Sequence, residues 1–175
     1  RDSRFQLPPG VSLYGGFSGT ESALFARSWT ACQCTLSGDI GVRGDSTDNA
    51  YHVVVAASDS VVLDGFVVAY GYGGPGSISG GGLLADDYVH LEVRNCVFYA
   101  NSAEYYGGGA LLGVYVTGNI ANCCFVANTA LQGGAIYFAR SSPAVTNCVF
   151  AYNHAGGNGG AITTRNAPCE PFMNC

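Results

Sequence analysis

Gly133-Gly134-Ala135-Ile136 begins a repeat that runs through Asn147-Cys148-Val149-Phe150 and Asn153, and the repeat starts again at Gly159-Gly160-Ala161-Ile162. The same glycine phrase already stands at Gly108-Gly109-Ala110-Leu111. A fixed period in the twenties, built from strand-like pieces, is typical of a solenoid whose units cannot bury a core alone. The repeat therefore indicates a stack of similar coils.

The Asn-Cys pairs give the length of one coil. They recur 27, 25 and 27 residues apart, at Asn95-Cys96, Asn122-Cys123, Asn147-Cys148 and Asn174-Cys175. Signals for hairpin turns between neighbouring strands are scarce, which argues against a sandwich. The sequence predicts an all-β chain, a right-handed parallel β-helix of about six to seven coils of about 26 residues each.

Each coil can be divided into short strands. In the clearest repeat, three strands are expected over residues 135–139, 144–146 and 148–151, with a bend at Asn147. Alternation predicts that five side chains point inward, namely Ile136, Phe138, Val145, Cys148 and Phe150. It places Thr146 and Val149 outward. Leu63-Asp64-Gly65-Phe66-Val67-Val68 fits the same slot, with Phe66 in the cysteine position and Val68 in the phenylalanine position.

Equivalent residues of successive coils should form columns along the axis. The expected structural ladder consists of Cys96, Cys123, Cys148 and Cys175, of Phe98, Phe125 and Phe150, and of Asn101, Asn128 and Asn153. Asparagines stacked at a bend can bond amide to amide along the axis. We therefore assign them a structural role.

The chain of 175 residues is expected to form a single β-helix domain over residues 1–175. Residues 1–79 should form irregular coils and residues 80–175 regular repeats. Two excursions, over residues 18–33 and 41–49, should leave the coil, and loops on a rigid scaffold often carry binding sites. The chain begins without Met and ends on a repeat motif, so we interpret it as a fragment of a longer secreted precursor.

Charge limits the range of partners. Charged residues make up 11% of the chain, the net charge is −5, and all seven positive side chains are arginine. Phosphate backbones require concentrated positive charge, so nucleic acid is not an expected partner. A lysine general base is excluded. No apolar run reaches the roughly 18 residues of a membrane span, so no span is expected in this segment.

Eight cysteines favour an oxidising compartment but leave their pairing open. The column of Cys96, Cys123, Cys148 and Cys175 could hold buried thiols or disulfides, and parallel Cβ vectors favour thiols. Cys124 should face away from the column. Cys32, Cys34 and Cys169 lie in irregular segments and are the better disulfide candidates. No zinc-type spacing is present.

A glycine-rich loop concentrates three aspartates, Asp39, Asp45 and Asp48. Calcium prefers such oxygen-rich loops, but Arg43 lies in the middle and no EF-hand spacing is present. Calcium and a plain Asp-capped turn are therefore both open, and no other cofactor is expected. Arg43-Gly44-Asp45 also matches an integrin-type tripeptide that arises often by chance. Asp86-Asp87 suits a solvated turn better than a metal site.

Catalytic groups are not evident. Acid–base chemistry on a polysaccharide requires carboxylates that converge on one outward face. The outward positions of the repeats are instead expected to be Tyr99, Tyr137, Thr146 and Val149. His52, His90 and His154 occupy different coil positions, without an evident Asp or Ser partner. The sequence predicts no enzyme, with a polysaccharide lyase as the alternative.

The glycine phrase combined with Phe-x-x-Asn resembles the repeat of the polymorphic outer-membrane proteins. It is similar as well to right-handed β-helix repeats of bacterial surface proteins in the pectate-lyase-like superfamily. The opening at residues 10–21, with Arg27-Ser28-Trp29 and the segment at residues 36–40, is similar to the lead-in of large secreted β-helix proteins. The resemblance implies an extracellular, non-catalytic role at a cell surface and supplies no catalytic residue.

Three functions follow from these observations. The favoured one is a structural or adhesive β-solenoid of a bacterial cell surface, whose partners are a surface glycan or protein, or another copy stacked end to end into a fibre. Its expected exterior is rich in tyrosine, at Tyr70, Tyr72, Tyr105, Tyr106 and Tyr115, which suits sugar stacking or protein docking. The second is a carbohydrate-binding module, and the third is a polysaccharide lyase or hydrolase.

Overall fold

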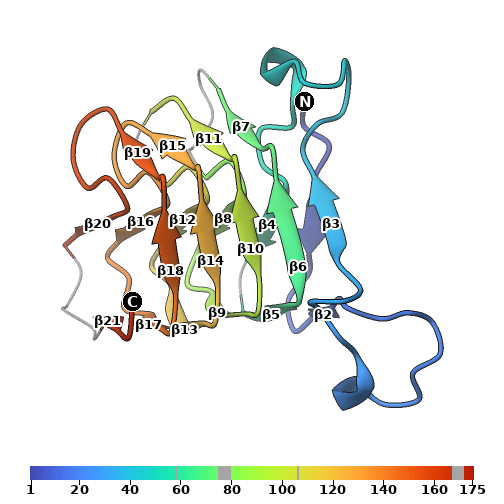
Figure 1. The fold of residues 1–175 in the computed structure, drawn as a ribbon. Coiled ribbons are helices and arrows are strands. Elements are labelled where there is room, and N and C mark those ends of the chain that lie inside the picture. Colours follow the sequence, from blue (N-terminus) through green and yellow to red (C-terminus); the bar gives the residue numbers. More distant parts are fainter. Residues whose placement is uncertain (58, 75–79, 106, 167–171) are drawn as a thin grey trace.

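The computed structural model describes residues 1–57, 59–74, 80–105, 107–166 and 172–175. The chain winds around one axis, and its strands form four parallel sheets that we call A, B, C and D (Figure 1). Sheet A contains, in order along the axis, β1 (Phe5–Leu7), β4 (Val54–Ala57), β8 (Leu83–Asp86), β12 (Leu111–Val114), β16 (Ile136–Ala139) and β20 (Ile162–Arg165).

The other three sheets repeat this order along the axis. Sheet B contains β2 (Ser12–Tyr14), β5 (Ser60–Asp64), β9 (His90–Arg94), β13 (Thr117–Ala121), β17 (Ala144–Thr146) and β21 (Phe172–Met173). Sheet C contains β3 (Cys34–Ser37), β6 (Phe66–Ala69), β10 (Val97–Tyr99), β14 (Cys124–Val126) and β18 (Val149–Ala151). Sheet D contains the two-residue strands β7 (Tyr72–Gly73), β11 (Ser102–Ala103), β15 (Thr129–Ala130) and β19 (His154–Ala155).

The β-helix prediction is confirmed, but the number of coils is smaller than predicted. Four turns pass through all four sheets, β4–β7, β8–β11, β12–β15 and β16–β19, and partial turns made of β1–β3 and β20–β21 flank them. The period predicted the spacing correctly, whereas the count of six to seven included the partial turns. Figure 1 shows the front sheet C rising and the back sheet A descending as the chain advances from N to C, which is a right-handed winding.

The predicted strands of the clearest repeat are close to the observed ones. Residues 144–146 form β17 as expected, β16 begins one residue later than predicted, and Asn147 turns the chain with a φ of 51°. The short strand of sheet D was not predicted, because two residues are too few to show alternation. The strand β1 was also missed.

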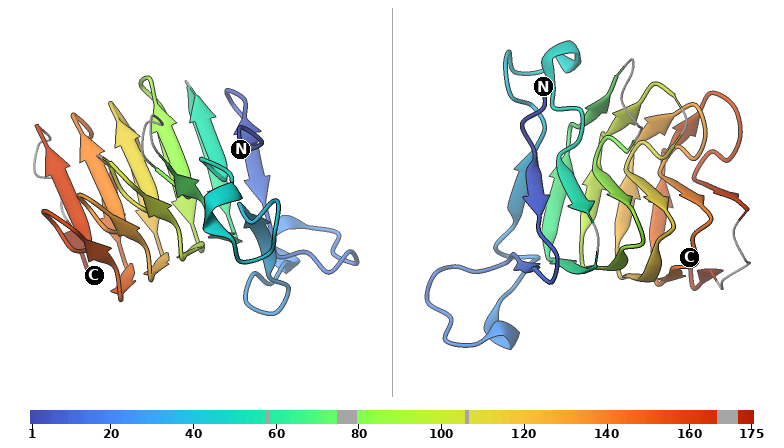
Figure 2. Two further views of the ribbon diagram at one scale, coloured as in Figure 1. Left: turned by 90° about the horizontal axis from the view of Figure 1, so that it is seen from above. Right: turned by 180° about the vertical axis from the view of Figure 1, so that it is seen from behind.

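The first third of the chain also forms coils interrupted by two excursions, as predicted. Gly65, with a φ of +85°, lies between β5 and β6, in the segment that the sequence matched to the repeat. The predicted slot of Val68 is confirmed, since Val68 pairs in register with Phe98. Both predicted excursions are loops, and each contains a short 3₁₀ helix, Leu24–Ala26 and Ser46–Asp48. Figure 2 shows both loops projecting from the N-terminal end of the solenoid, at opposite corners.

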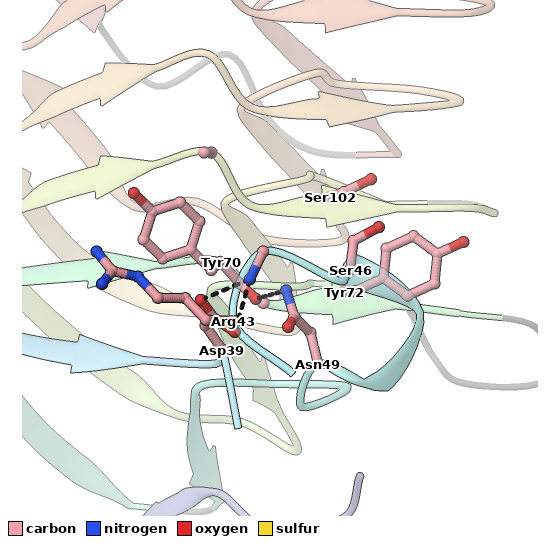
Figure 3. Close-up of a pocket in the computed structure, with 10 residues that line it drawn as sticks. Asp39, Arg43, Ser46, Asn49, Tyr70, Tyr72 and Ser102 are labelled. Atoms are coloured by element: carbon pink, nitrogen blue, oxygen red, sulfur yellow. Dashed lines mark hydrogen bonds between the residues drawn. The ribbon is translucent and has the colours of Figure 1, made fainter. Parts of the chain in front are cut away.

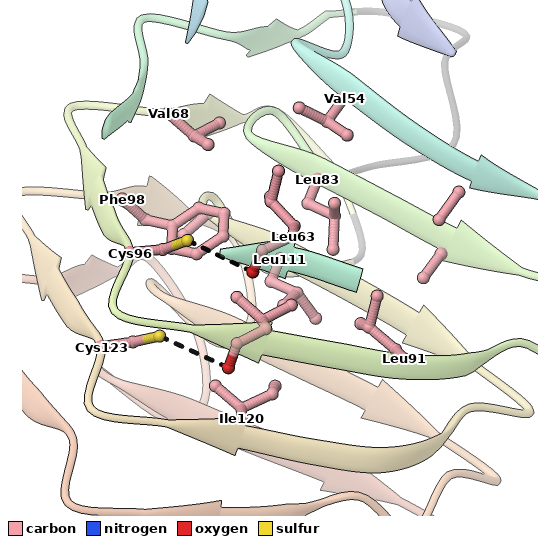
Figure 4. Packing of buried hydrophobic residues seen from close by; sticks show 14 of the residues in the cluster. Val54, Leu63, Val68, Leu83, Leu91, Cys96, Phe98, Leu111, Ile120 and Cys123 are labelled. Atoms are coloured by element: carbon pink, nitrogen blue, oxygen red, sulfur yellow. Dashed lines mark hydrogen bonds between the residues drawn. The ribbon is translucent and has the colours of Figure 1, made fainter. Parts of the chain in front are cut away.

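The core is a column of inward side chains. Phe98, Phe125 and Phe150 stack with ring centroids 5.0 Å apart and planes within 5° of parallel. Val145 and Cys148 are buried as predicted. Figure 4 shows other buried side chains of the core, among them Leu63, Leu83, Leu91, Leu111 and Ile120. Burial of each large side chain contributes on the order of 1.5–3 kcal/mol.

Tyr137 was predicted to face outward, and its orientation is as predicted, but its burial was not expected. It lies on the outer face of sheet A but is only 4% exposed. A Cβ on Gly108 would come within 2.7 Å of the Tyr137 backbone nitrogen, and a Cβ on Gly80 within 2.9 Å of Leu112 Cβ. The glycine-rich segments that lead into each repeat therefore fold back over this face and cover it.

Candidate functional site

The asparagine column occupies the inside of the turn between sheets C and D. Asn101 Nδ2 donates to Asn128 Oδ1 at 3.1 Å, and Asn128 Nδ2 donates to Asn153 Oδ1 at 3.0 Å. Asn128 Nδ2 also reaches Phe98 O at 3.0 Å. Asn101 and Asn128 are 1% and 0% exposed. The amides therefore satisfy backbone groups of neighbouring coils, which is a structural role.

The cysteine column donates to backbone carbonyls one coil earlier. Cys96 Sγ contacts Leu63 O at 3.6 Å, and Cys123 Sγ contacts Val93 O at 3.7 Å (Figure 4). Cys148 is buried as well, whereas Cys175 is exposed in the last rung. The thiol of Cys123 lowers the pKa of Cys148 to about 7. All four cysteines of the column are free thiols in the structure.

The cysteines outside the column form no disulfide among the described residues. Cys32 is a free thiol in the first excursion, Cys34 is a free thiol at the start of β3, and Cys34 Sγ lies 3.8 Å from Cys32 O. Cys124 is half-buried and lies next to the buried Cys123, as its predicted opposite orientation requires. Cys169, the third disulfide candidate, lies outside the described residues, as does Tyr106.

A pocket of about 340 Å³ lies where the second excursion folds against the corner between sheets C and D. We call it the excursion pocket (Figure 3), and its lining consists of Asp39, Arg43, Gly44, Ser46, Asn49, Tyr70, Gly71, Tyr72, Ala100 and Ser102. The loop contributes charged and polar groups, whereas the solenoid contributes two tyrosines and a serine. The sequence predicted binding at this excursion but not the coil residues that complete the pocket.

Hydrogen bonds fix most polar groups of the excursion pocket, but one acceptor stays free. Asp39 accepts from Gly44 N at 3.3 Å, and Asn49 Nδ2 donates to Tyr70 O at 2.8 Å. Asn49 is 6% exposed, and its Oδ1 has no hydrogen-bond partner. The Tyr72 hydroxyl donates to Glu104, and this bond raises the pKa of Tyr72. A buried acceptor without a partner favours occupation by a donor from outside.

The three aspartates of the predicted calcium site bind the loop itself. Asp45 caps the 3₁₀ helix by accepting from Thr47 N at 2.9 Å, and its bonds to Thr47 lower its pKa. Asp48 Oδ2 accepts from Val42 N at 2.7 Å. The part of the chain that the structure describes holds no group of three or more acidic, histidine or cysteine ligands suited to a metal ion. The bonds of Asp45 and Asp48 are those of an Asp-capped turn, and the calcium site stays a prediction.

The first excursion is held by a buried ion pair that the sequence did not predict. Arg27 Nη2 lies 2.7 Å from Asp64 Oδ2, and both side chains are 7% exposed. Arg27 Nη1 also donates to Gly15 O at 3.0 Å, and the guanidinium lies 5.1 Å from the Trp29 ring centroid. Arg27 and Asp64 are 37 residues apart in the sequence, so no local signal marked the pair.

The remaining candidates do not form a catalytic group among the described residues. Burial lowers the pKa of His52, whose Nδ1 lies 3.0 Å from Gly80 O. His90 contacts Glu92 and Thr117 at the surface, and His154 is exposed. Asp87 N donates to Asp86 Oδ1 in a surface turn, as expected for that pair.

The fold and the columns define a β-solenoid of repeated coils. Residues 147–165, which include Asn147-Cys148, Phe150, Asn153 and the last glycine phrase, match the Chlamydia polymorphic membrane protein repeat. The resemblance expected from the sequence is thereby confirmed for this repeat. Neither the curated proteins nor the solved structures gave a match.

The matched repeat and the parallel coils indicate an adhesin-like β-solenoid of a bacterial surface. Among the described residues, no helix is long and apolar enough to span a membrane.

Proposed function

We propose that the protein is a non-catalytic, extracellular adhesive β-solenoid of a bacterial cell surface, and that the excursion pocket is its ligand site. The match to a surface-protein repeat supports the location. The free Oδ1 of the buried Asn49 is the observation that carries the proposal, because the repeat asparagines are bonded within the coils. The excursion pocket therefore has hydrogen-bonding capacity that the fold itself does not use.

The chemistry of the excursion pocket favours a polyhydroxyl ligand. Ser46 and Ser102 offer hydroxyl groups, Arg43 offers donors, and the rings of Tyr70 and Tyr72 offer apolar surface. Saccharides combine hydroxyl groups with flat apolar faces, so they complement such a lining. The carbohydrate-binding module is thus the second candidate function, and it uses the same site.

A glycan array and a cell-binding assay with the full chain test the site. Asp39→Asn and Arg43→Gln should each weaken ligand binding by roughly tenfold, which corresponds to about 1.4 kcal/mol for a lost charged hydrogen bond. Arg4→Gln is the matched control, because Arg4 is exposed, lies outside the excursion pocket and donates to the Gln6 side chain. Unchanged binding by both pocket variants would contradict the proposed site.

The non-catalytic role is tested separately. Glycoside hydrolysis ordinarily requires two carboxylates around the bond, and Asp39 is the one carboxylate in the lining of the excursion pocket. We expect no release of reducing ends or unsaturated uronates from a broad polysaccharide panel, with or without calcium. Steady product release that Asp39→Asn abolishes would show that the protein is an enzyme.

Stacking into a fibre is a further mode of assembly that the sheets allow. The parallel sheets share one axis, so the coils of a second copy could continue them in register. An unpaired strand edge is a template for pairing with another copy. Electron microscopy of the native protein at neutral pH distinguishes the cases, since rods favour assembly and short separate particles favour a single adhesive domain.

A further inference from the structure

A second column of side chains lines the corner between sheets A and B. Tyr88, Tyr115, Arg140 and Asn166 occupy corresponding turns of successive coils, and each has a left-handed φ between 50° and 63°. We call this set the corner column. Left-handed backbone is uncommon for tyrosine and arginine and costs on the order of 1 kcal/mol. The asparagines of the Asn-Cys pairs, such as Asn122 with a φ of 55°, show that asparagine fits such turns, so the choice of these larger side chains calls for an explanation.

The corner column holds Arg140 in a fixed position. The rings of Tyr88 and Tyr115 stack with centroids 4.7 Å apart and planes at 18°. The Arg140 guanidinium carbon lies 5.4 Å from the Tyr115 ring centroid, and Nη1 donates to the Tyr115 hydroxyl. A guanidinium held in this way loses less conformational entropy when it binds a ligand.

Arg140 and Arg165 line the same groove of about 260 Å³, together with Val114, Tyr137, Ala139 and Asn166. The two arginines belong to adjacent coils, and Arg140 N donates to Arg165 O at 2.9 Å. We call this depression the arginine groove. It lies on the outer side of sheet A, whereas the excursion pocket lies at the corner between sheets C and D.

The arginines of this groove lack acidic partners among the described residues. Arg27 and Arg94 pair with Asp64 and Glu92, whereas Arg140 and Arg165 have no ion pair. This arrangement is notable in a chain whose net charge is −5. Two neighbouring guanidinium groups present planar arrays of donors that match a carboxylate or a sulfate.

The corner column changes charge along its length. Asp86 and Asp87 lie beside Tyr88 at one end, and the two arginines lie at the other. A chain with negative charge on every unit would meet repulsion at the acidic end. The column therefore suits a ligand whose negative group lies at the arginine end.

We propose that the arginine groove binds an acidic sugar, through a carboxylate or sulfate held by Arg140 and Arg165. Strands β12 and β16 at the groove are paired on both sides, so a peptide could not add to either of them as a strand, whereas β20 is paired on one side among the described strands. For recognition by side chains, the guanidinium groups, the Asn166 amide and the apolar surface of Val114 and Ala139 complement a substituted sugar ring.

Calorimetry with the full chain tests this proposal. The probes are an oligosaccharide with a single terminal galacturonate, a singly sulfated oligosaccharide and a neutral oligosaccharide of equal length. We expect one acidic probe or both to bind, the neutral probe to bind at least tenfold more weakly, and the affinity to fall as salt rises. The two acidic probes distinguish a carboxylate from a sulfate. Circular dichroism and thermal unfolding confirm that each variant is folded.

Variants locate the binding. Arg140→Gln and Arg165→Gln should each lower the affinity for the acidic probe by about tenfold, whereas Arg4→Gln should leave this affinity unchanged. Arg43→Gln should also leave it unchanged, so failure of the proposed excursion pocket and failure of the arginine groove are distinguishable. Three results would overturn the proposal: no binding of either acidic probe, no effect of Arg140→Gln, or equal binding of an oligoglutamate that depends equally on Arg140.

Discussion

The regular coils and the N-terminal coils of this solenoid maintain the same register by different means. In residues 80–166, aligned asparagines, cysteines and phenylalanines repeat from coil to coil and bond to each other or to the adjacent backbone. In the first coils, Phe66, Val68 and Gly71 stand in the cysteine, phenylalanine and asparagine slots, and Arg27 with Asp64 ties the excursion to the coil. Periodic bonding satisfies the polar groups inside the regular coils, whereas its interruption makes room for loops and a pocket.

The largest expected effect is the loss of an interior asparagine of the regular coils. Asn128→Ala removes the amide that bonds to Asn153 Oδ1 and Phe98 O and accepts from Asn101 N. The groups left unpaired are buried, so we expect a loss of about 4 kcal/mol in the free energy of unfolding. Urea denaturation measures it. Thr129→Ala, at an exposed neighbour, should change stability by less than about 0.5 kcal/mol, and equal losses would contradict the role of the column.

The next largest effect is expected from loss of the Arg27–Asp64 ion pair, which ties the first excursion to the N-terminal coils. Arg27→Ala leaves Asp64 buried without its partner, and this should cost about 3 kcal/mol. The first excursion should also become more sensitive to proteolysis, because its anchor is lost. Arg4→Ala at an exposed site is the control. A stable variant with an unchanged proteolysis pattern would show that the ion pair does not hold the loop.

The ladder could be predicted from the sequence because a solenoid converts a sequence period directly into spatial register. Phe98, Phe125 and Phe150 are a fixed distance apart along the chain and therefore stack in space. The burial of Tyr137 was not predicted, because alternation tells which side of a strand faces the core but not whether another segment covers its outer side. The cover consists of glycine-rich backbone from other coils, and its position depends on the completed fold.

The candidate site was less predictable than the fold. The excursion at residues 41–49 could be recognised because it interrupts the period, and its aspartates could be identified as cap residues or metal ligands. Tyr72 and Ser102 lie far from it in the sequence and reach the pocket only through the winding of the coils. The Arg27–Asp64 pair was missed for the same reason, since a single contact across an irregular loop has no period.

A smaller effect is expected from substitutions at two positions of the phenylalanine column, Phe125 and Phe150. Val68 occupies the phenylalanine position in an earlier coil, and Phe125→Val places the same side chain at position 125. The substitution removes a ring that stacks on both sides, so about 2 kcal/mol of stability should be lost. Phe150→Val removes a half-buried ring that stacks on Phe125 alone, and it should cost about half as much. Thermal unfolding of both variants measures the difference. Equal costs would mean that stacking adds little to burial.

The smallest effect is a pH dependence that belongs to the N-terminal coils. Burial lowers the pKa of His52 in the folded chain below its ordinary value of 6.5. The unfolded chain therefore binds a proton more readily, so stability is complete above about pH 6.5 and decreases as the pH falls below it. His52→Gln should flatten this decline in urea denaturation between pH 7.5 and 5.5, and His154→Gln, at an exposed ring, should leave it unchanged. If His52→Gln left the decline unaltered, other groups would be its source, and the comparison would then rest on the ion pair alone.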